Sequence, residues 1–369
     1  MNATEAAAKI REALARFSPV WVSPPVLQPV RFYLEWLGED LRARAFLTQS
    51  EDGHDLCLRP DMTAPACRIA LAHHVVPWAV AYEGQVFRRQ NAGSQKEQEF
   101  VQVGLECLAT PPGEADLIAA SLEAARACGA DPSLRLGHTK VMDALLAGLG
   151  LHPLWAARLK AQIRRGAPLR ADAPATSAQA LTRALAGLAP DDAGAALSAL
   201  YEAAGITAVG ARPPAAIARR LQEKAALAQA PAPTADQMTL LSQALTVDGP
   251  VDEAVKALAG LIRNKAVADR APAQAALDAV AEQWQALIGL VKPPLTRFAP
   301  GFGRALSIYD GFVFELEAPA LGERASLGGG GRYDALVQAV ARDLGRADAS
   351  SLRASGFALR PARLAEAAQ

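Results

Sequence analysis

The stretch GQVFRRQNAGSQKEQEFVQVGLE, from Gly84 to Glu106, contains two predicted strands joined by a long polar loop. The second strand alternates at period two, and one of its faces carries Phe100, Gln102, Gly104 and Glu106. A polar strand face either meets solvent or lines a pocket. The glycine in its middle leaves room for a group to lie between Gln102 and Glu106. The alternation alone leaves both interpretations open.

Strand and turn signals fill the chain up to about residue 150 and return from about Pro293. Between them, residues 151–290 are rich in alanine and leucine, with charges at helical spacing and several prolines. The segment VDEAVKALAGLI follows Gly249 and Pro250, which favours a helix start. The order of strands, helical block and strands predicts an α+β fold. Its antiparallel sheet would be formed by residues 1–150 and 291–369, and residues 151–290 would be a helical insertion.

Charge and cysteine content exclude several classes of protein. The 369 residues include 38 basic and 38 acidic side chains, so no basic excess favours general binding to nucleic acid. The cysteines form no CxxC pair, and the adjacent His73 and His74 lack the helical spacing of two metal ligands. We therefore predict no metal site. The cysteines concerned are Cys57, Cys67, Cys107 and Cys128.

The N-terminal sequence MNATEAAAKIREALARF shows helical periodicity and acidic residues, unlike a secretory signal. No run of 18 uncharged apolar residues occurs along the chain, so no membrane span is expected. Unpaired thiols fit a reducing compartment. Together these features predict a cytoplasmic protein.

The segment LRPDMTAP, from Leu58 to Pro65, ends a predicted strand. Pro60 favours an extended conformation at the residue before it and removes a backbone donor. Asp61 and Thr63 then offer a carboxylate and a hydroxyl close together. They either cap the following helix, APACRIALAHH, or bind a ligand.

Arginines stand near two further strands. Arg88 and Arg89 end the first strand of the opening stretch, where arginine is usually a solvated charge. A guanidinium can also bind a carboxylate or phosphate at two points. The segment GFGRALSIYDGFVFELEA places Arg304 and Tyr309 before a strand apolar enough to be central. By residue type alone, Arg304 could be a surface charge and Tyr309 a core ring.

The segment SLGGGGRYDALV, from Ser326 to Val337, contains four consecutive glycines. Glycine allows backbone conformations and close approaches that side chains forbid. The run matches neither GxGxxG nor a Walker loop, so it predicts either a flexible hairpin turn or a glycine-rich pocket loop. The residues of such a pocket loop would be Gly329, Gly330, Gly331, Arg332 and Tyr333.

Taken in order, these segments resemble the catalytic core of the histidyl-tRNA synthetases. LRPDMT is similar to their LRPEGT, VFRRQ to motif 2 FRxE, and FVQVGLE to FxQxGxE. GGGGRYDAL resembles GGRYDGL, and the terminal GFALRPARL resembles motif 3 GFAxGxERL. The resemblance covers most of the first 140 residues and the last 75. It implies a class II aminoacyl-tRNA synthetase-like antiparallel sheet of six or seven strands, flanked by helices.

The resemblance also implies a histidine pocket. Its residues would be Asp61, Thr63 and Gln102 at the α-amino group, Glu106 and Tyr309 at the imidazole, Arg304 at the carboxylate and aminoacyl phosphate, and Arg88 at the α-phosphate of ATP. The polar face of the opening stretch would then line a pocket. A buried carboxylate such as Glu106 needs a donor, and an imidazole N–H would supply one.

Several positions depart from the synthetase pattern. Asp61 replaces a glutamate, and Gln90 replaces the motif 2 acid. Arg360 occupies a glycine position of motif 3, where ATP would approach the backbone, whereas Arg363 keeps the motif arginine. The sequence ends at Gln369, where a synthetase would continue into an anticodon-binding domain. We therefore expect no catalytic residues and no tRNA charging.

This pattern resembles the regulatory subunits of ATP phosphoribosyltransferase. The resemblance implies a non-catalytic chain that activates a short-form catalytic subunit and makes the first step of histidine biosynthesis sensitive to histidine. It implies a homodimer within a hetero-octamer, with histidine as the regulatory ligand and no cofactor. Two alternatives remain: a synthetase-like enzyme that activates an amino acid with ATP, and a tRNA-binding synthetase fragment with salt-dependent binding.

Overall fold

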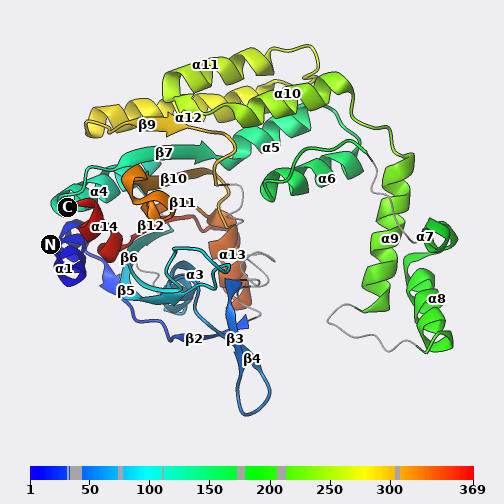
Figure 1. The fold of residues 1–369 in the computed structure, drawn as a ribbon, viewed down its shortest axis with the longest axis horizontal. Helices are drawn as coiled ribbons and strands as arrows, with labels where there is room; N and C mark the ends of the chain where they lie inside the picture. Colours follow the sequence, from blue (N-terminus) through cyan, green and yellow to red (C-terminus); the bar gives the residue numbers. More distant parts are fainter. Residues whose placement is uncertain are drawn as a thin grey trace. The chain divides into compact units, whose positions relative to one another are not determined.

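The computed structural model describes residues 1–30, 33, 44–73, 78–109, 112–172, 179–205, 213–303 and 308–369 (Figure 1). Their contacts divide the chain into two compact units. The first comprises Met1–Leu145, Gln243–Asn264 and Arg270–Gln369, and the second comprises Leu146–Ser242 and Lys265–Asp269. All the strands that the structure describes belong to the first unit.

A nine-stranded sheet forms the centre of the first unit, counted over the described residues. Its order is β1 (Val20–Trp21), β5 (Ala79–Phe87), β6 (Glu99–Leu108), β12 (Ala354–Leu359), β11 (Ser326–Arg332), β10 (Phe312–Glu317), β7 (Ser133–His138), β9 (Thr296–Phe298) and β8 (Gly249–Pro250). The strands from β5 to β7 run antiparallel, which confirms the predicted fold class. β1 and β9 pair in parallel. The sheet exceeds the six or seven strands implied because β1, β8 and β9, of two or three residues each, extend its ends.

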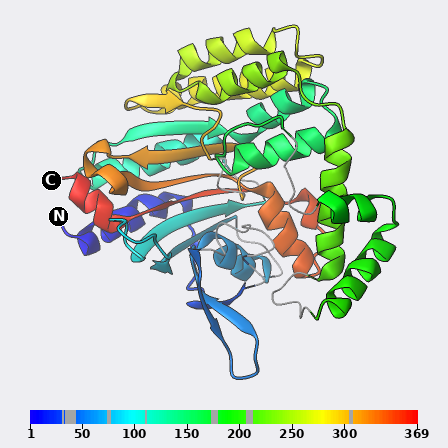
Figure 2. The same ribbon diagram turned by 45° about the vertical axis from the view of Figure 1, so that its right-hand side comes forward.

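Helices flank both faces of this sheet (Figure 2). On one face, α4 (Glu114–Ala127) contacts β10, β11 and β12, and both α1 (Ala3–Leu14) and α14 (Pro361–Ala367) contact β6. On the other, α3 (Thr63–Leu71) contacts β5 and β6, and α13 (Asp334–Asp343) contacts α3 and β12. The predicted N-terminal helix is confirmed as α1.

A capping box begins α1. The Asn2 side chain accepts from the Glu5 backbone N–H at 2.9 Å, and the Glu5 carboxylate accepts from the Asn2 N–H at 3.0 Å. These two bonds satisfy donors that the helix itself leaves unpaired. The buried side chains of α1 recur at helical spacing, so one stripe of the helix packs inward. They are Ala6, Ala7, Ile10 and Leu14.

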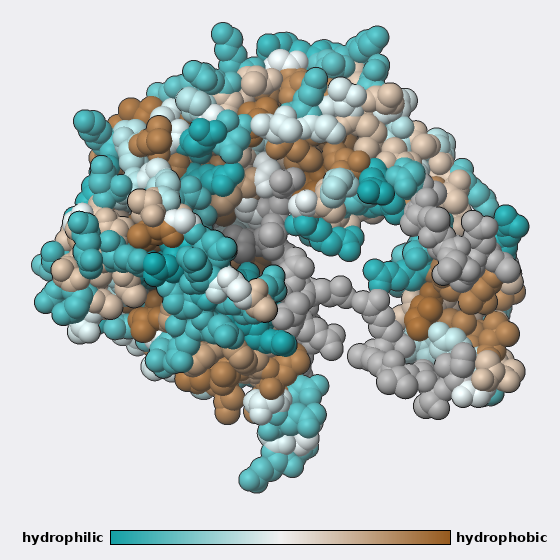
Figure 3. Space-filling model, in the orientation of Figure 1, coloured by the Kyte–Doolittle hydropathy of each residue, from teal (hydrophilic) through white to brown (hydrophobic). Residues whose placement is uncertain are grey.

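A second sheet of three short strands lies in the order β2 (Leu27–Pro29), β4 (Asp55–Leu58) and β3 (Phe46–Gln49). Leu27 and Leu47 are 49% and 57% exposed, and both line a groove of about 620 Å³. Figure 3 shows brown surface at the base of the β3–β4 hairpin. An exposed apolar patch of this kind commonly marks a surface that binds another protein.

The second unit is helical, as predicted for the middle of the chain. It contains α6 (Pro153–Arg164), α7 (Gln179–Ala186), α8 (Pro190–Ala203), α9 (Pro214–Gln229) and most of α10 (Ala235–Thr246). Proline stands in the first turn of α6, α8 and α9, where a missing backbone N–H costs no hydrogen bond. A cluster of Leu185, Ala193, Leu197 and Ala218 joins α7, α8 and α9.

The second unit is shorter than the predicted insertion of 151–290. Helices α11 (Val251–Ile262) and α12 (Ala271–Leu290) belong to the first unit, where α11 contacts β8 and β9, and α12 contacts α4. The boundary near residue 290 therefore differs from the observed division. Composition could not separate these helices from the second unit because both groups are rich in alanine and leucine. The remaining helical elements are α5 (Thr139–Gly148), η1 (Ala15–Phe17), η2 (Pro319–Arg324) and η3 (Ala349–Ser351).

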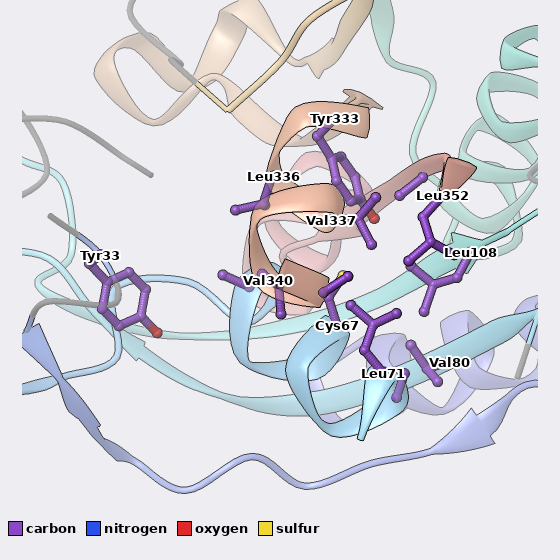
Figure 4. Close-up of a cluster of buried hydrophobic side chains, with 14 of the residues drawn as sticks. Tyr33, Cys67, Leu71, Val80, Leu108, Tyr333, Leu336, Val337, Val340 and Leu352 are labelled. Carbon is purple, nitrogen blue, oxygen red and sulfur yellow. The ribbon is translucent and has the colours of Figure 1, made fainter. Parts of the chain in front are cut away.

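Between α3 and α13 lies a buried apolar cluster (Figure 4). Its members include Cys67, Leu71, Val80, Leu108, Val337, Val340 and Leu352. Tyr333, 1% exposed, belongs to the same cluster, so its ring is fixed by packing from both helices. All four cysteines are buried and free. Among the described helices, none has the length and apolar character needed to cross a bilayer.

Candidate functional site

The sheet face beneath α3 and α13 is rich in glycine. Glu106 of β6 lies opposite Gly356 of β12, and Gly356 lies opposite Gly331 of β11. Tyr82 of β5 lies opposite Gly104 of β6. Residues directly opposite each other in an antiparallel pair share a face. These positions therefore form one continuous surface with few side chains.

Each of these glycines leaves space that another side chain occupies. A Cβ at Gly104 would lie 2.5 Å from the Tyr82 hydroxyl oxygen. A Cβ at Gly356 would overlap the Glu106 carboxylate, and one at Gly331 would lie 2.8 Å from the Tyr309 ring. The space predicted between Gln102 and Glu106 is thus filled in part by Tyr82, which comes from the neighbouring strand.

Glu106 is 1% exposed and is held by two tyrosines. The Tyr82 hydroxyl donates to Oε1 at 2.8 Å, and the Tyr333 hydroxyl donates to Oε2. Burial raises the pKa of Glu106 to about 7, although hydrogen bonds from Tyr333, Thr63 and Tyr82 lower it. A carboxylate has about four acceptor positions. Glu106 can therefore accept a further N–H from a ligand.

Asp61 and Thr63 lie at the start of α3. The Asp61 carboxylate accepts from the Ala64 N–H at 3.4 Å, so the cap interpretation is partly right, although the bond is long. Burial raises the pKa of Asp61, and the nearby charge of Arg88 lowers it. Asp61 therefore caps α3 weakly and also lies near the positive charge of Arg88.

Within the described residues, two polar groups on this face lack a partner. Gln102 is 8% exposed, and its buried Oε1 accepts no hydrogen bond within the part of the chain that the structure describes. Tyr309 is half-buried, with its ring 6.4 Å from that of Tyr333, and its hydroxyl bonds no described residue. Burial and the charge of Glu106 raise the pKa of Tyr309, so its hydroxyl stays protonated. Buried polar groups are normally paired, so the buried Oε1 of Gln102 points to a ligand.

Arginines gather at the other end of the face. The Arg88 Nε donates to the Pro60 carbonyl at 2.7 Å, and its guanidinium lies 5.3 Å from the centre of the Phe100 ring. Arg360 lies 4.4 Å from the same ring centre. Arg363, by contrast, is 3% exposed and already paired. The face therefore has an acidic end at Glu106 and a basic end at Phe100.

The structure brings most of the predicted site residues together. Those on this face or at its edge are Asp61, Thr63, Arg88, Gln102, Glu106, Tyr309 and Tyr333. Arg304 lies outside the described residues.

The predicted glycine-rich loop is wrong, because this segment is β11 in the middle of the sheet. Glycine suits the strand because its neighbours approach too closely for side chains. A Cβ at Gly329 would overlap the Phe314 carbonyl, and one at Gly330 would overlap the Gly356 carbonyl. Gly330 and Arg332 belong to the opposite face, where Arg332 pairs with Glu114 of α4 at 2.5 Å.

Sequence reasoning missed Tyr82 and the role of Gly356. Tyr82 lies two residues before Gly84 and therefore shares its strand face, so the alternation of the first strand could have identified Tyr82. Its place opposite Gly104 depends on the register across the long loop between β5 and β6, and such a loop does not fix register. Among the described residues, no group of three or more His, Cys, Asp or Glu side chains could hold a metal ion.

Known proteins resemble the chain over most of its length. The histidyl-tRNA synthetase family model matches residues 2–210 and 195–364. An ATP phosphoribosyltransferase regulatory subunit of Brucella anthropi is 35% identical over 333 residues, 86% of each chain. One from Chelativorans is 36% identical over 354 residues, 90% of each chain. The chain belongs to the histidyl-tRNA synthetase-like family of ATP phosphoribosyltransferase regulatory subunits.

Two solved structures share the fold of this chain. An ATP phosphoribosyltransferase regulatory subunit/histidyl-tRNA synthetase from Bacillus halodurans has a TM-score of 0.66 at 21% identity, over 100% of this chain and 79% of its own. A histidine–tRNA ligase subunit from Alicyclobacillus acidocaldarius has a TM-score of 0.62 at 19% identity, over 99% and 92%. The synthetase-like sheet flanked by helices is therefore shared with these two structures.

Proposed function

We propose that the chain is a non-catalytic regulatory subunit that activates a short-form ATP phosphoribosyltransferase and makes it sensitive to histidine. The observation that carries the proposal is the polarity of the glycine-lined face. It has a buried acid at one end, an unpaired amide in the middle and arginines at the other end. Histidine offers an imidazole N–H donor, an ammonium group and a carboxylate in the same order along its length.

In this proposal, Glu106 and Tyr309 bind the imidazole. Asp61, Thr63 and Gln102 bind the α-amino group, which matches the unpaired Gln102 acceptor and the partly buried Asp61 carboxylate. The role of Arg304 at the carboxylate rests on the family resemblance. Arg88, at the basic end, would contact an anion.

The contacts of the residues that would face a nucleotide support a role without catalysis. Arg363 donates to the Glu97 carboxylate at 2.5 Å and to the Ser326 carbonyl at 2.9 Å. Gln90, at the position of the motif 2 acid, donates to the Glu97 carbonyl at 3.2 Å. Arg360 lies on the Phe100 ring. These groups are engaged with the protein itself, so ATP would have to displace existing contacts.

The regulatory role requires coupling between histidine and the catalytic partner. Histidine can shift the complex only by its difference in affinity for the two states, typically about 1–3 kcal/mol. The linkage is reciprocal: if histidine weakens binding of a substrate to the partner, that substrate must weaken histidine binding by the same factor. A homodimer within a hetero-octamer remains part of the proposal, and native mass spectrometry of the complex would test it.

The decisive experiment reconstitutes the chain with a short-form catalytic subunit from the same genome. We expect phosphoribosyl transfer to rise on complex formation and to fall on addition of histidine. Gln102→Met, which removes the unpaired amide, should leave activation intact but require more histidine for inhibition. If the variant loses activation and inhibition together while the complex stays assembled, a feedback-sensor role is wrong. Histidine-dependent pyrophosphate exchange would instead favour an amino-acid-activating enzyme, and salt-dependent tRNA binding a synthetase fragment.

A further inference from the structure

Two arginines share one aromatic ring at the basic end of the pocket. The guanidinium carbons of Arg360 and Arg88 lie 4.4 Å and 5.3 Å from the centre of the Phe100 ring. Phe100 shares its strand face with Gln102 and Glu106 because the three residues are separated by even steps along β6. Both arginines therefore lie on the pocket side of the sheet.

The position of Arg360 follows from the sheet register. Leu359 is the last residue of β12 and pairs with Val103 of β6. The residue that follows β12 is Arg360, and the residue before Val103 in β6 is Gln102. Continued by one residue, this register places Arg360 opposite Gln102, on the strand face that carries Phe100 and Glu106.

Neither arginine has a carboxylate bound to its guanidinium. The Arg360 side chain makes no hydrogen bond or ion pair with the residues that the structure describes. The Arg88 side chain donates only to the Pro60 carbonyl within the same described ranges. Burial and the charges of Arg88 and Arg363 lower the pKa of Arg360 to about 9, although the charges of Glu315 and Glu97 raise it. Carboxylates act on both guanidinium groups from a distance, Asp61 on Arg88 and both Glu315 and Glu97 on Arg360. Neither arginine forms an ion pair with them among the described residues, and two neighbouring cations without a bound anion are costly in a partly buried site.

We propose that Arg360, together with Arg88, forms an oxyanion receptor at the end of the pocket opposite Glu106. Planar guanidinium groups bind carboxylate or phosphate oxygens at two points. The identity of the oxyanion rests on the proposed function. If the chain binds histidine, the oxyanion is the carboxylate group of that histidine. Its ammonium group would then lie near the Gln102 acceptor. Alternatively, a separate phosphate group could supply the oxyanion, because its oxygens bind guanidinium groups in the same way.

The ring contacts disfavour a nucleotide as the source of the phosphate. The guanidinium groups of Arg88 and Arg360 both occupy positions over Phe100, so the ring is not free to stack on a base. The synthetase motif has glycine at the Arg360 position, so the resemblance implies an anion contact at Arg88 but none at Arg360. The inference therefore concerns a side chain that the synthetase motif lacks.

Calorimetry on the full chain tests the receptor with histidine and with histidinol, which lacks the carboxylate. Wild type should bind histidine at least about tenfold more tightly than histidinol. In Arg360→Gln this ratio should fall toward one. Arg342→Gln, on the exposed side of α13, is the matched control and should keep the wild-type ratio. If Arg360→Gln does not fold, Arg360→Lys keeps the charge without the planar fork and should lower the ratio.

A phosphate titration separates the two sources. If the histidine-to-histidinol ratio is unchanged in Arg360→Gln but wild type binds phosphate or pyrophosphate through Arg360, the oxyanion is a separate phosphate. If neither the ratio nor phosphate binding depends on Arg360, the receptor is wrong. A wild-type chain that binds no histidine would overturn the proposed function, and the phosphate titration alone would then decide the receptor.

Discussion

Glu106→Gln should change how the stability of the protein depends on pH. The pKa of Glu106 is about 7 in the folded protein and 4.5 without burial. Because the folded value is higher, the folded state keeps a proton that the unfolded state releases between pH 4.5 and 7. The stability contributed by this proton is fully present below pH 4.5 and is lost as pH rises through 7. Glutamine keeps the shape of the side chain but cannot titrate.

The magnitude follows from the difference between the two pKa values. A shift from 4.5 to about 7 corresponds to about 3 kcal/mol when fully developed. Between pH 5.5 and 8 the expected change is about 2 kcal/mol, because part of the loss occurs below pH 5.5. Glu106→Gln should therefore gain stability relative to wild type by about this amount as pH rises from 5.5 to 8.

Urea unfolding at pH 5.5 and pH 8 gives the free energy of unfolding of the variant and of wild type. The difference between the two proteins at each pH measures this effect, because the contributions of other titrating groups cancel. Glu83→Gln is the control, because it makes the same chemical change at an exposed side chain of β5 that pairs with Arg11. It should show no comparable pH dependence. An equal stability difference for Glu106→Gln at both pH values would refute the buried, titrating carboxylate. Glu106→Ala is less suitable because it leaves the hydroxyls of Tyr82 and Tyr333 unpaired.

Two further substitutions test the glycine-lined face. Gly356→Ala should unfold the chain or abolish histidine binding, because the added Cβ would overlap both Glu106 and the Leu105 carbonyl; thermal unfolding and calorimetry would show it. Its control is Gly260→Ala in α11, where the Cβ meets open space and stability should rise by up to about 1 kcal/mol. Tyr82→Phe should cost about 1–3 kcal/mol in urea unfolding above pH 7, because the ionised Glu106 loses a donor; an unchanged midpoint would contradict that bond.

Sequence patterns predicted the long elements and missed the short ones. The alternation around Gly104 predicted the hairpin of β5 and β6, and the helical spacing of the first residues predicted α1. Strands of two or three residues, such as β1 and β9, are too short for any alternation to appear. The glycine run was misassigned because glycine weakens an isolated strand, whereas in β11 the close approach of both neighbouring strands requires it.

Site prediction depended on the family resemblance more than on local chemistry. Asp61 and Gln102 had competing interpretations by residue type alone, and the order of motifs decided between them. Sequence could not provide contacts that depend on register, such as that of Tyr82 with Glu106. Arg360 stood out as a departure from the motif, but its contact with Phe100 is visible only in the structure.

The amino-acid end and the nucleotide end of the site differ in whether their polar side chains are already paired, and this changes the free energy of ligand binding. A side chain already paired must lose that bond before it binds a ligand, whereas an unpaired one gains a bond. A hydrogen bond to a charged group is worth about 1.5–3 kcal/mol. Gln102 is unpaired within the described residues, and Arg363 is paired with Glu97. Binding of an amino acid therefore costs no existing bond at Gln102, whereas binding of a nucleotide phosphate at Arg363 does.

Glu97→Gln tests this argument directly. The variant loses the charge that pairs with Arg363 at 2.5 Å but keeps a side chain of similar size. We expect it to bind ATP more tightly than wild type, by up to about tenfold, and to leave histidine affinity unchanged. Calorimetry with ATP and with histidine measures both, and Glu323→Gln, at an exposed glutamate, is the control. Unchanged ATP affinity would mean that the Arg363–Glu97 pair does not keep nucleotides out, and the contact of Arg360 with Phe100 would remain as the barrier.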